Sequence, residues 1–123
     1  MVMSTDNLEW FEGLFATVDN MDSGGFVSYL TEDASFVMGS QPAVKGREAI
    51  AASTSGFFGT LKGIGHNLIR TWVSGDTRIC QGEVTYDLSD GRSVTMPFVN
   101  VFVMEGDLIQ EYLVYVDPTP MMA

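Results

Sequence analysis

Residues 65–116 read GHNLIRTWVSGDTRICQGEVTYDLSDGRSVTMPFVNVFVMEGDLIQEYLVYV. Apolar and polar side chains alternate through this stretch, and a period of two is typical of β-strands. Three short polar groups interrupt the alternation, Ser74-Gly75-Asp76, Ser89-Asp90-Gly91 and Glu105-Gly106-Asp107, and each has the composition of a hairpin turn. The stretch therefore predicts four long strands, over residues 65–73, 78–88, 93–104 and 108–116, joined as an antiparallel meander.

The first half of the chain has helical periodicity instead. Five apolar residues recur at spacings of three and four and so share one helical face: Leu8, Phe11, Leu14, Phe15 and Val18. They predict a helix over about 6–19, followed by a short amphipathic segment at 24–30, a short strand at 34–38 and a helix from 46 to about 58. This order predicts one α+β domain over 1–123, with N-terminal helices packed on the concave face of a cone-shaped, curved antiparallel sheet.

Composition limits the partners of the protein. Sixteen acidic residues against six basic ones give a formal charge of −10, and the basic residues are scattered along the chain. Such a surface repels nucleic acid and anionic lipid, so we predict neither as a partner. The apolar stretches are too short to span a membrane, and the N-terminus has no basic residue that would begin a secretory signal, which favours a cytoplasmic protein.

Nothing in the sequence predicts a cofactor or a metal site. The chain has one cysteine, Cys80, and one histidine, His66, so it cannot form an internal disulfide or a Cys/His zinc site. The pair Gly24-Gly25 lacks the surrounding residues of a phosphate-binding loop. Any chemistry must therefore come from the side chains of the protein itself.

Four segments carry a resemblance to a known superfamily: YLTEDASFV (29–37), VKGREAI (44–50), GHNLIRTWVSGDT (65–77) and PFVNVFVMEGDLIQEYLVYVDPTP (97–120). Together with the order of elements, they resemble the nuclear transport factor 2-like cone, which is also called cystatin-like. That superfamily includes ketosteroid isomerases, SnoaL-like polyketide cyclases and limonene epoxide hydrolases. The resemblance implies a cofactor-free enzyme, or a binding module, built around the inside of the cone.

The resemblance also implies where catalytic residues of such relatives would fall. The charged residues of the epoxide hydrolases fall on Val84, Tyr86 and Val114, and their water-orienting pair falls on Phe36 and Met38. The catalytic aspartate of the cyclases also falls on Val114. In the isomerases the base falls near Val37 or Met38, the tyrosine near Leu14 and the protonated aspartate on Asn100. Only Asn100 and Tyr86 are polar, so none of the three mechanisms carries over intact.

Strand alternation predicts which side chains line the inside of the cone. If Asn100 faces inward, Met96, Phe98 and Phe102 share its face. The matching faces of the neighbouring strands carry Val84, Tyr86 and Leu88, and Tyr112, Val114 and Val116. We predict ligand contacts from Phe36, Met38, Val84, Phe98, Tyr112 and Val114, and polar catalytic groups from Tyr86, Asn100 and His66. The same apolar residues are also what an ordinary core would contain.

The direction of His66 decides between two interpretations. Histidine is the side chain whose ordinary titration lies near neutrality, which makes it the natural candidate for proton transfer. A two-residue Ser74-Gly75 turn would place His66 opposite Glu83, outside the cone, where the two would form a cross-strand pair at a subunit interface. A single bulge or a three-residue turn would instead bring His66 inside, beside Tyr86.

The outward face of the predicted sheet is also apolar, since it carries Ile79, Val99, Val101, Val103, Leu113 and Tyr115. We expect a homodimer to cover it. For function we weigh two hypotheses: a cofactor-free isomerase or cyclase acting on a small hydrophobic carbonyl or epoxide compound, and a non-catalytic binding or interaction module that has lost the catalytic carboxylates. His66 pointing inward favours the first.

Overall fold

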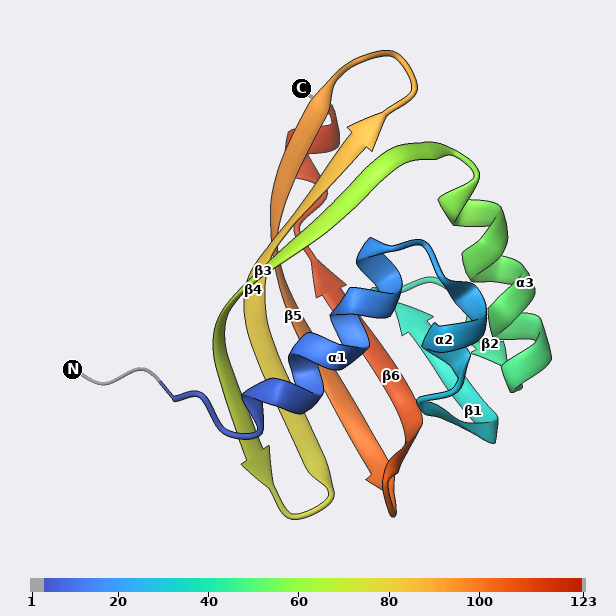
Figure 1. The fold of residues 1–123 in the computed structure, drawn as a ribbon, viewed down its shortest axis with the longest axis vertical. Coiled ribbons are helices and arrows are strands. Elements are labelled where there is room, and N and C mark those ends of the chain that lie inside the picture. Colours follow the sequence, from blue (N-terminus) through green and yellow to red (C-terminus); the bar gives the residue numbers. More distant parts are fainter. Residues whose placement is uncertain (1–3, 123) are drawn as a thin grey trace.

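The computed structural model of the protein describes residues 4–122, which form three α-helices, six β-strands and a short 3₁₀ helix (Figure 1). The helices are α1 (Leu8–Asp19), α2 (Ser23–Val27) and α3 (Arg47–Phe58). The strands are β1 (Leu30–Met38), β2 (Val44–Lys45), β3 (Leu61–Ser74), β4 (Thr77–Leu88), β5 (Ser93–Glu105) and β6 (Leu108–Val116), and the 3₁₀ helix η1 is Thr119–Met122. The predicted α+β order is confirmed.

All six strands belong to one curved sheet in the order β2-β1-β6-β5-β4-β3 (Figure 1). Strands β3 to β6 pair antiparallel with their neighbours in sequence, which confirms the predicted meander. However, β1 runs parallel to β6, with Phe36 opposite Tyr112, so the sheet is mixed and the prediction of a wholly antiparallel sheet is wrong. A short turn forces its two strands to be antiparallel, whereas β1 and β6 are far apart in the chain and no turn fixes their relative direction.

Two strand assignments at the edge of the sheet differ from the prediction. β1 begins at Leu30 rather than at residue 34, because the polar segment that suggests a turn is held beside β6 by a 2.7 Å hydrogen bond between the Thr31 hydroxyl and the Gln110 side chain. The two-residue strand β2 was not predicted. It pairs Val44 with Phe36, and two residues are too few to show any periodicity.

The helices cover the concave face of the sheet, and α1 lies across it (Figure 1). Phe11, Leu14 and Phe15 of α1 are buried, so the predicted apolar stripe is the face that packs on the strands. The burial of β5 alternates from Val94 to Met104, with Asn100 and its same-face neighbours turned into the core. The alternation that predicted the strands therefore also gives the correct inner face.

Phe102 lies at the centre of an aromatic cluster between α1 and the sheet. Its side chain is fully buried, and its ring centroid lies 4.6 Å from that of Tyr112, 5.6 Å from Trp10 and 5.9 Å from Phe11. Tilted and edge-to-face contacts at these distances are favourable beyond the area that they bury. The cluster fixes α1 against β5 and β6 and so closes one end of the cone.

A β-bulge between Leu68 and Arg70 sets the register of β3 against β4. Leu68 pairs with Gly82 and Arg70 with Gln81, so one residue of β3 has no partner. Gly82 permits this close approach, because a Cβ atom at that position would lie 2.2 Å from the backbone oxygen of Asn67. Residues 63–68 of β3, between this bulge and a second register shift at Leu61/Gly63, are thereby turned to the face opposite to the one a regular hairpin would give them.

Candidate active site

A pocket of about 70 Å³ lies between the concave face of the sheet and the three helices. The structure brings all nine sequence-predicted site residues into its wall: Phe36, Met38, His66, Val84, Tyr86, Phe98, Asn100, Tyr112 and Val114. The remaining lining residues come mainly from the helices and the strand ends: Val18, Phe26, Thr54, Phe57, Phe58, Ile64 and Val116. The predicted residues therefore share one place, while the roles given to them stay predictions.

The wall of the pocket is mainly apolar and has few polar groups. These are the side chains of His66, Tyr86, Asn100 and Tyr112, with Thr54 on α3. No carboxylate of the described residues belongs to the wall. Since pockets for drug-sized ligands usually measure about 300–1,000 Å³, this space admits a small molecule or one part of a larger one.

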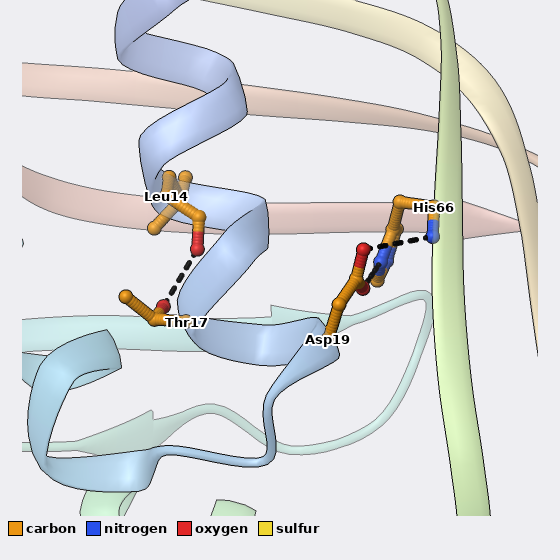
Figure 2. A network of polar contacts seen from close by, with 4 residues as sticks. All are labelled: Leu14, Thr17, Asp19 and His66. Carbon is orange, nitrogen blue, oxygen red and sulfur yellow. Dashed lines mark hydrogen bonds and ion pairs between the residues drawn. The ribbon is translucent and has the colours of Figure 1, made fainter.

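His66 is paired with Asp19, a residue that the sequence analysis did not select. The Nδ1 atom of His66 lies 2.5 Å from one carboxylate oxygen of Asp19, and the backbone N–H of His66 donates to the other oxygen over 3.1 Å. Figure 2 shows the carboxylate reaching from the end of α1 to both groups on β3, next to the turn of α1 where Thr17 bonds to the backbone of Leu14. This two-point contact fixes the ring and leaves Nε2 as its other proton-exchanging atom.

The position of Asp19 in α1 is unfavourable for the helix itself. Asp19 is the last residue of α1, where the helix dipole is negative and a carboxylate is repelled. Its two hydrogen bonds to His66 offset that repulsion. The only sequence signal for this partner is an acidic residue at a helix end where a basic one would be expected, and it does not reveal which strand the carboxylate meets.

The imidazole of His66 is held inside the protein. The ring of Phe15 stacks on it with centroids 4.5 Å apart, and Phe98 meets it edge-on at 5.4 Å. Because of the bulge, His66 lies opposite Val84, and Asn67 takes the place opposite Glu83. The alternative in which His66 pairs with Glu83 outside the cone is therefore wrong. The expected pairing with Tyr86 is replaced by Asp19, although Tyr86 and His66 line the same pocket.

Asn100 and Tyr112 form the polar end of the pocket. Asn100 is 3% exposed, and within residues 4–122 its Oδ1 atom has no hydrogen-bond partner. Burial raises the pKa of the Tyr112 hydroxyl well above its usual value, while a hydrogen bond from the side chain of Asn100 acts weakly in the opposite direction. Tyr112 is therefore a neutral donor at physiological pH. An unpartnered buried amide oxygen is costly, and a ligand or water that donates to it would remove that cost.

Tyr86 is the fourth polar group of the wall. Burial raises the pKa of its hydroxyl above the usual value, so it too is neutral near pH 7. Its ring meets Phe57 of α3 edge-on, with centroids 5.4 Å apart. The pocket thus combines one acid–base group, His66, with neutral hydrogen-bonding groups.

Among residues 4–122, no three His, Cys, Asp or Glu side chains come close enough together to hold a metal ion. Within the same range, none of the helices combines the length and apolar character that crossing a membrane requires.

Solved structures show the fold class. A nuclear transport factor 2-like protein of unknown function from Burkholderia pseudomallei superposes with a TM-score of 0.84 at 16% identity, over 94% of each chain. A candidate SnoaL-like polyketide cyclase from Jannaschia sp. CCS1 gives 0.82 at 20% identity, over 99% of this chain and 92% of that one. An LEH-like epoxide hydrolase from M. tuberculosis gives 0.81 at 16% identity, over 97% and 88%. These likenesses define a nuclear transport factor 2-like, cystatin-like cone.

The sequence itself gives the family. The model of the SnoaL-like domain family matches residues 11–112, so the chain belongs to that family. No protein with a curated description matches the sequence. The positions that the resemblance aligns with charged residues of the epoxide hydrolases, Val84, Tyr86 and Val114, do line the pocket, but they are uncharged here. His66, whose Nδ1 atom lies 2.5 Å from Asp19, lines the same pocket.

Proposed function

We propose that this protein is a cofactor-free enzyme of the isomerase or cyclase type that moves a proton on a small, mostly apolar carbonyl compound. The observation that carries the proposal is the orientation of His66, which lines the pocket while Asp19 holds its Nδ1 atom. A histidine fixed by a carboxylate on one nitrogen is arranged to accept or give a proton with the other.

The proposed reaction uses three groups in the wall. The Nε2 atom of neutral His66 takes a proton from the carbon next to the substrate carbonyl, and the electron pair of that C–H bond forms the enolate. The Tyr112 hydroxyl donates a hydrogen bond to the enolate oxygen. If His66 returns the proton to the oxygen instead of to carbon, the resulting enol O–H can donate to Oδ1 of Asn100. With a β,γ-unsaturated carbonyl compound the enolate is a conjugated dienolate, and return of the proton from His66 to its γ carbon completes an isomerisation. In a cyclisation, the enolate carbon attacks a second carbonyl, and the alkoxide formed there takes the proton from His66.

A specific observation favours a second candidate function, a non-catalytic binding module. The pocket measures only about 70 Å³, and no described carboxylate belongs to its wall. A module of this kind would hold a small apolar molecule by shape and by hydrogen bonds to Asn100 and Tyr112, with the Asp19–His66 pair serving only to join α1 to β3. The two candidates differ in one measurable property, which is whether bound carbonyl compounds exchange their protons faster.

The test is deuterium exchange at the carbons next to the carbonyl of cyclohexanone in D₂O, followed by NMR. We expect the protein to accelerate exchange and His66→Ala to remove at least about 99% of that acceleration, since general bases contribute about 10²–10⁴-fold. Asn67→Ala is the matched control, because Asn67 is the next residue on β3 and its side chain is exposed.

We also expect Asp19→Asn to reduce the exchange rate and to alter its pH profile. Asp19→Glu should restore part of the rate and part of the pH profile.

The exposed acid Glu12, on the same helix as Asp19, provides the control for charge alone, and Glu12→Gln should leave exchange unchanged. Binding of cyclohexanone without faster exchange would establish the binding module instead. Equal exchange in the wild type and in His66→Ala would rule out His66 as the base.

We also propose that the outer face of the sheet joins two copies of the chain. One register row crosses five strands with only apolar side chains: Val37, Leu113, Val101, Ile79 and Trp72. Trp72 is 36% exposed, and Tyr115 in the next row is 53% exposed. An apolar band of this length is typical of a protein interface, and a second copy presents the same band to it.

We expect light scattering to give about twice the chain mass of 13.4 kDa. Val101→Lys puts a charge at the centre of the band and should yield monomer. Ser55→Lys places the same charge on the exposed surface of α3 and should leave the mass unchanged. A monomeric wild type at micromolar concentration would contradict the proposed interface.

A further inference from the structure

A second hollow lies next to the pocket and shares part of its wall. This hollow, of about 300 Å³, lies between α3 and the segment that joins β1 to β2. Four side chains belong to both walls: Phe36, Met38, Thr54 and Phe57. We call the first space the inner pocket and the second the outer hollow. The two spaces therefore meet at these four side chains, which we call the partition.

Of the four side chains shared by the two walls, Phe57 is the most exposed to solvent. It is 37% exposed, whereas the next residue, Phe58, is 7% exposed. Its recorded aromatic contacts are the edge of Tyr86 at 5.4 Å and Phe58 at 6.3 Å. A large apolar side chain that is partly in water has few packing contacts to lose, so it can change rotamer at low cost. Met38, which also belongs to both walls, is unbranched and flexible and so fits ligands of different shape.

Among the described residues, no Asp, Glu, Lys or Arg side chain lines either space. Besides the shared residues, the outer hollow is lined by Gln41, Pro42, Val44 and Ser53. Its polar groups are therefore neutral, and the ionisable and buried polar groups all lie in the inner pocket. A space joined through the partition would fall in the range that drug-sized ligands occupy, which the inner pocket alone does not reach.

We propose that the ligand is an elongated, uncharged molecule whose polar head lies in the inner pocket and whose apolar tail passes Phe57 into the outer hollow. Phe57 is then a specificity-determining residue, because its position sets the length of tail that is accepted. The inference rests on the proposed function for the place of the head, beside Asn100 and His66. Binding of the tail in the outer hollow does not require the proposed reaction, so it can be tested by binding alone.

The test uses phenol and 4-hexylphenol as probes, with dissociation constants from titration calorimetry. The phenol hydroxyl can donate to the unpartnered oxygen of Asn100, and the hexyl chain is the tail. Each methylene removed from water improves binding by up to about fourfold. We therefore expect 4-hexylphenol to bind at least about tenfold more tightly than phenol. In Phe57→Ala, which removes a large side chain from both walls, we expect the affinity for 4-hexylphenol to rise relative to that for phenol.

Ser53→Phe is the decisive variant, because Ser53 lines only the outer hollow. It should weaken 4-hexylphenol about tenfold and leave phenol within twofold. Ser55→Phe, on the same helix but in neither wall, should change neither probe. Equal responses of 4-hexylphenol to Ser53→Phe and Ser55→Phe would overturn the two-part site while leaving the proposed function intact. Failure of both probes to bind the wild type, or phenol binding that is unaffected by Asn100→Leu, would overturn the proposed head site and this inference with it.

Discussion

Phe102→Ala is expected to lower the free energy of unfolding by about 3–5 kcal/mol. The side chain is fully buried and contacts three other aromatic rings, from α1 and β6. Its removal loses the transfer free energy of the ring and leaves a cavity that Trp10, Phe11 and Tyr112 cannot fill, because each is held by its own strand or helix. Urea denaturation followed by circular dichroism measures the loss, at one fixed protein concentration in case subunit association contributes.

Phe57→Ala is the matched control, since it removes the same atoms from a side chain that is 37% exposed. We expect it to lower the free energy of unfolding by about 1–2 kcal/mol. Equal losses in the two variants would mean that the cluster around Phe102 is not the part of the core that holds α1 to the sheet.

The long strands and the inner face of the cone can be predicted from the sequence because they follow from local alternation. β6 is Leu108–Val116 both as predicted and as observed, since the turn at 105–107 precedes it, Asp117 and Pro118 follow it, and its apolar residues alternate. The same alternation places Asn100 on the inner face of β5. Once Asn100 is assigned, the pairing of β5 with β4 and β6 gives the inner residues of those two strands. All nine predicted site residues then meet in one pocket.

The features that the sequence does not reveal depend on contacts between distant segments. The parallel pairing of β1 with β6 is not set by any turn, so local patterns do not contain it. The direction of His66 depends on a single bulge, and one unpaired residue exchanges the two faces of the strand. Gly82 is the residue in the sequence that reflects the bulge, because a side chain at this position would collide with the backbone of β3.

Asp19 could not be found from the sequence for a related reason. It belongs to the first helix and His66 to the third strand, and 47 residues separate them. Neither residue type nor spacing connects them. The pair arises only when α1 packs across the concave face and ends next to β3. The sequence therefore predicts the pocket from its apolar face, whereas the contact between Asp19 and His66 depends on the fold.

The buried thiol of Cys80 gives the second large prediction, a loss of stability in alkaline solution. Burial raises the pKa of Cys80 from 9.0 to about 12, and a backbone hydrogen bond with Asn100 opposes this only in part. The folded protein thus keeps the proton that the unfolded chain loses above pH 9. Because the folded state binds more protons in this range, the free energy of unfolding falls as pH rises from about 9 to about 12.

The expected loss is about 2 kcal/mol at pH 10.5 relative to pH 8, since each unit of pKa difference corresponds to 1.36 kcal/mol. Tyr112 and Tyr86, whose pKa values are raised above 10.0 by burial, add losses of the same sign as the pH rises above about 10. Urea denaturation across this range measures the total, and the difference between the wild type and Cys80→Ala isolates the thiol. Cys80→Ala is less stable at pH 8 but has the shallower pH dependence, so the two curves converge as pH rises. Parallel curves would mean that the thiol ionises as easily in the folded protein as in the unfolded chain, and that water reaches Cys80.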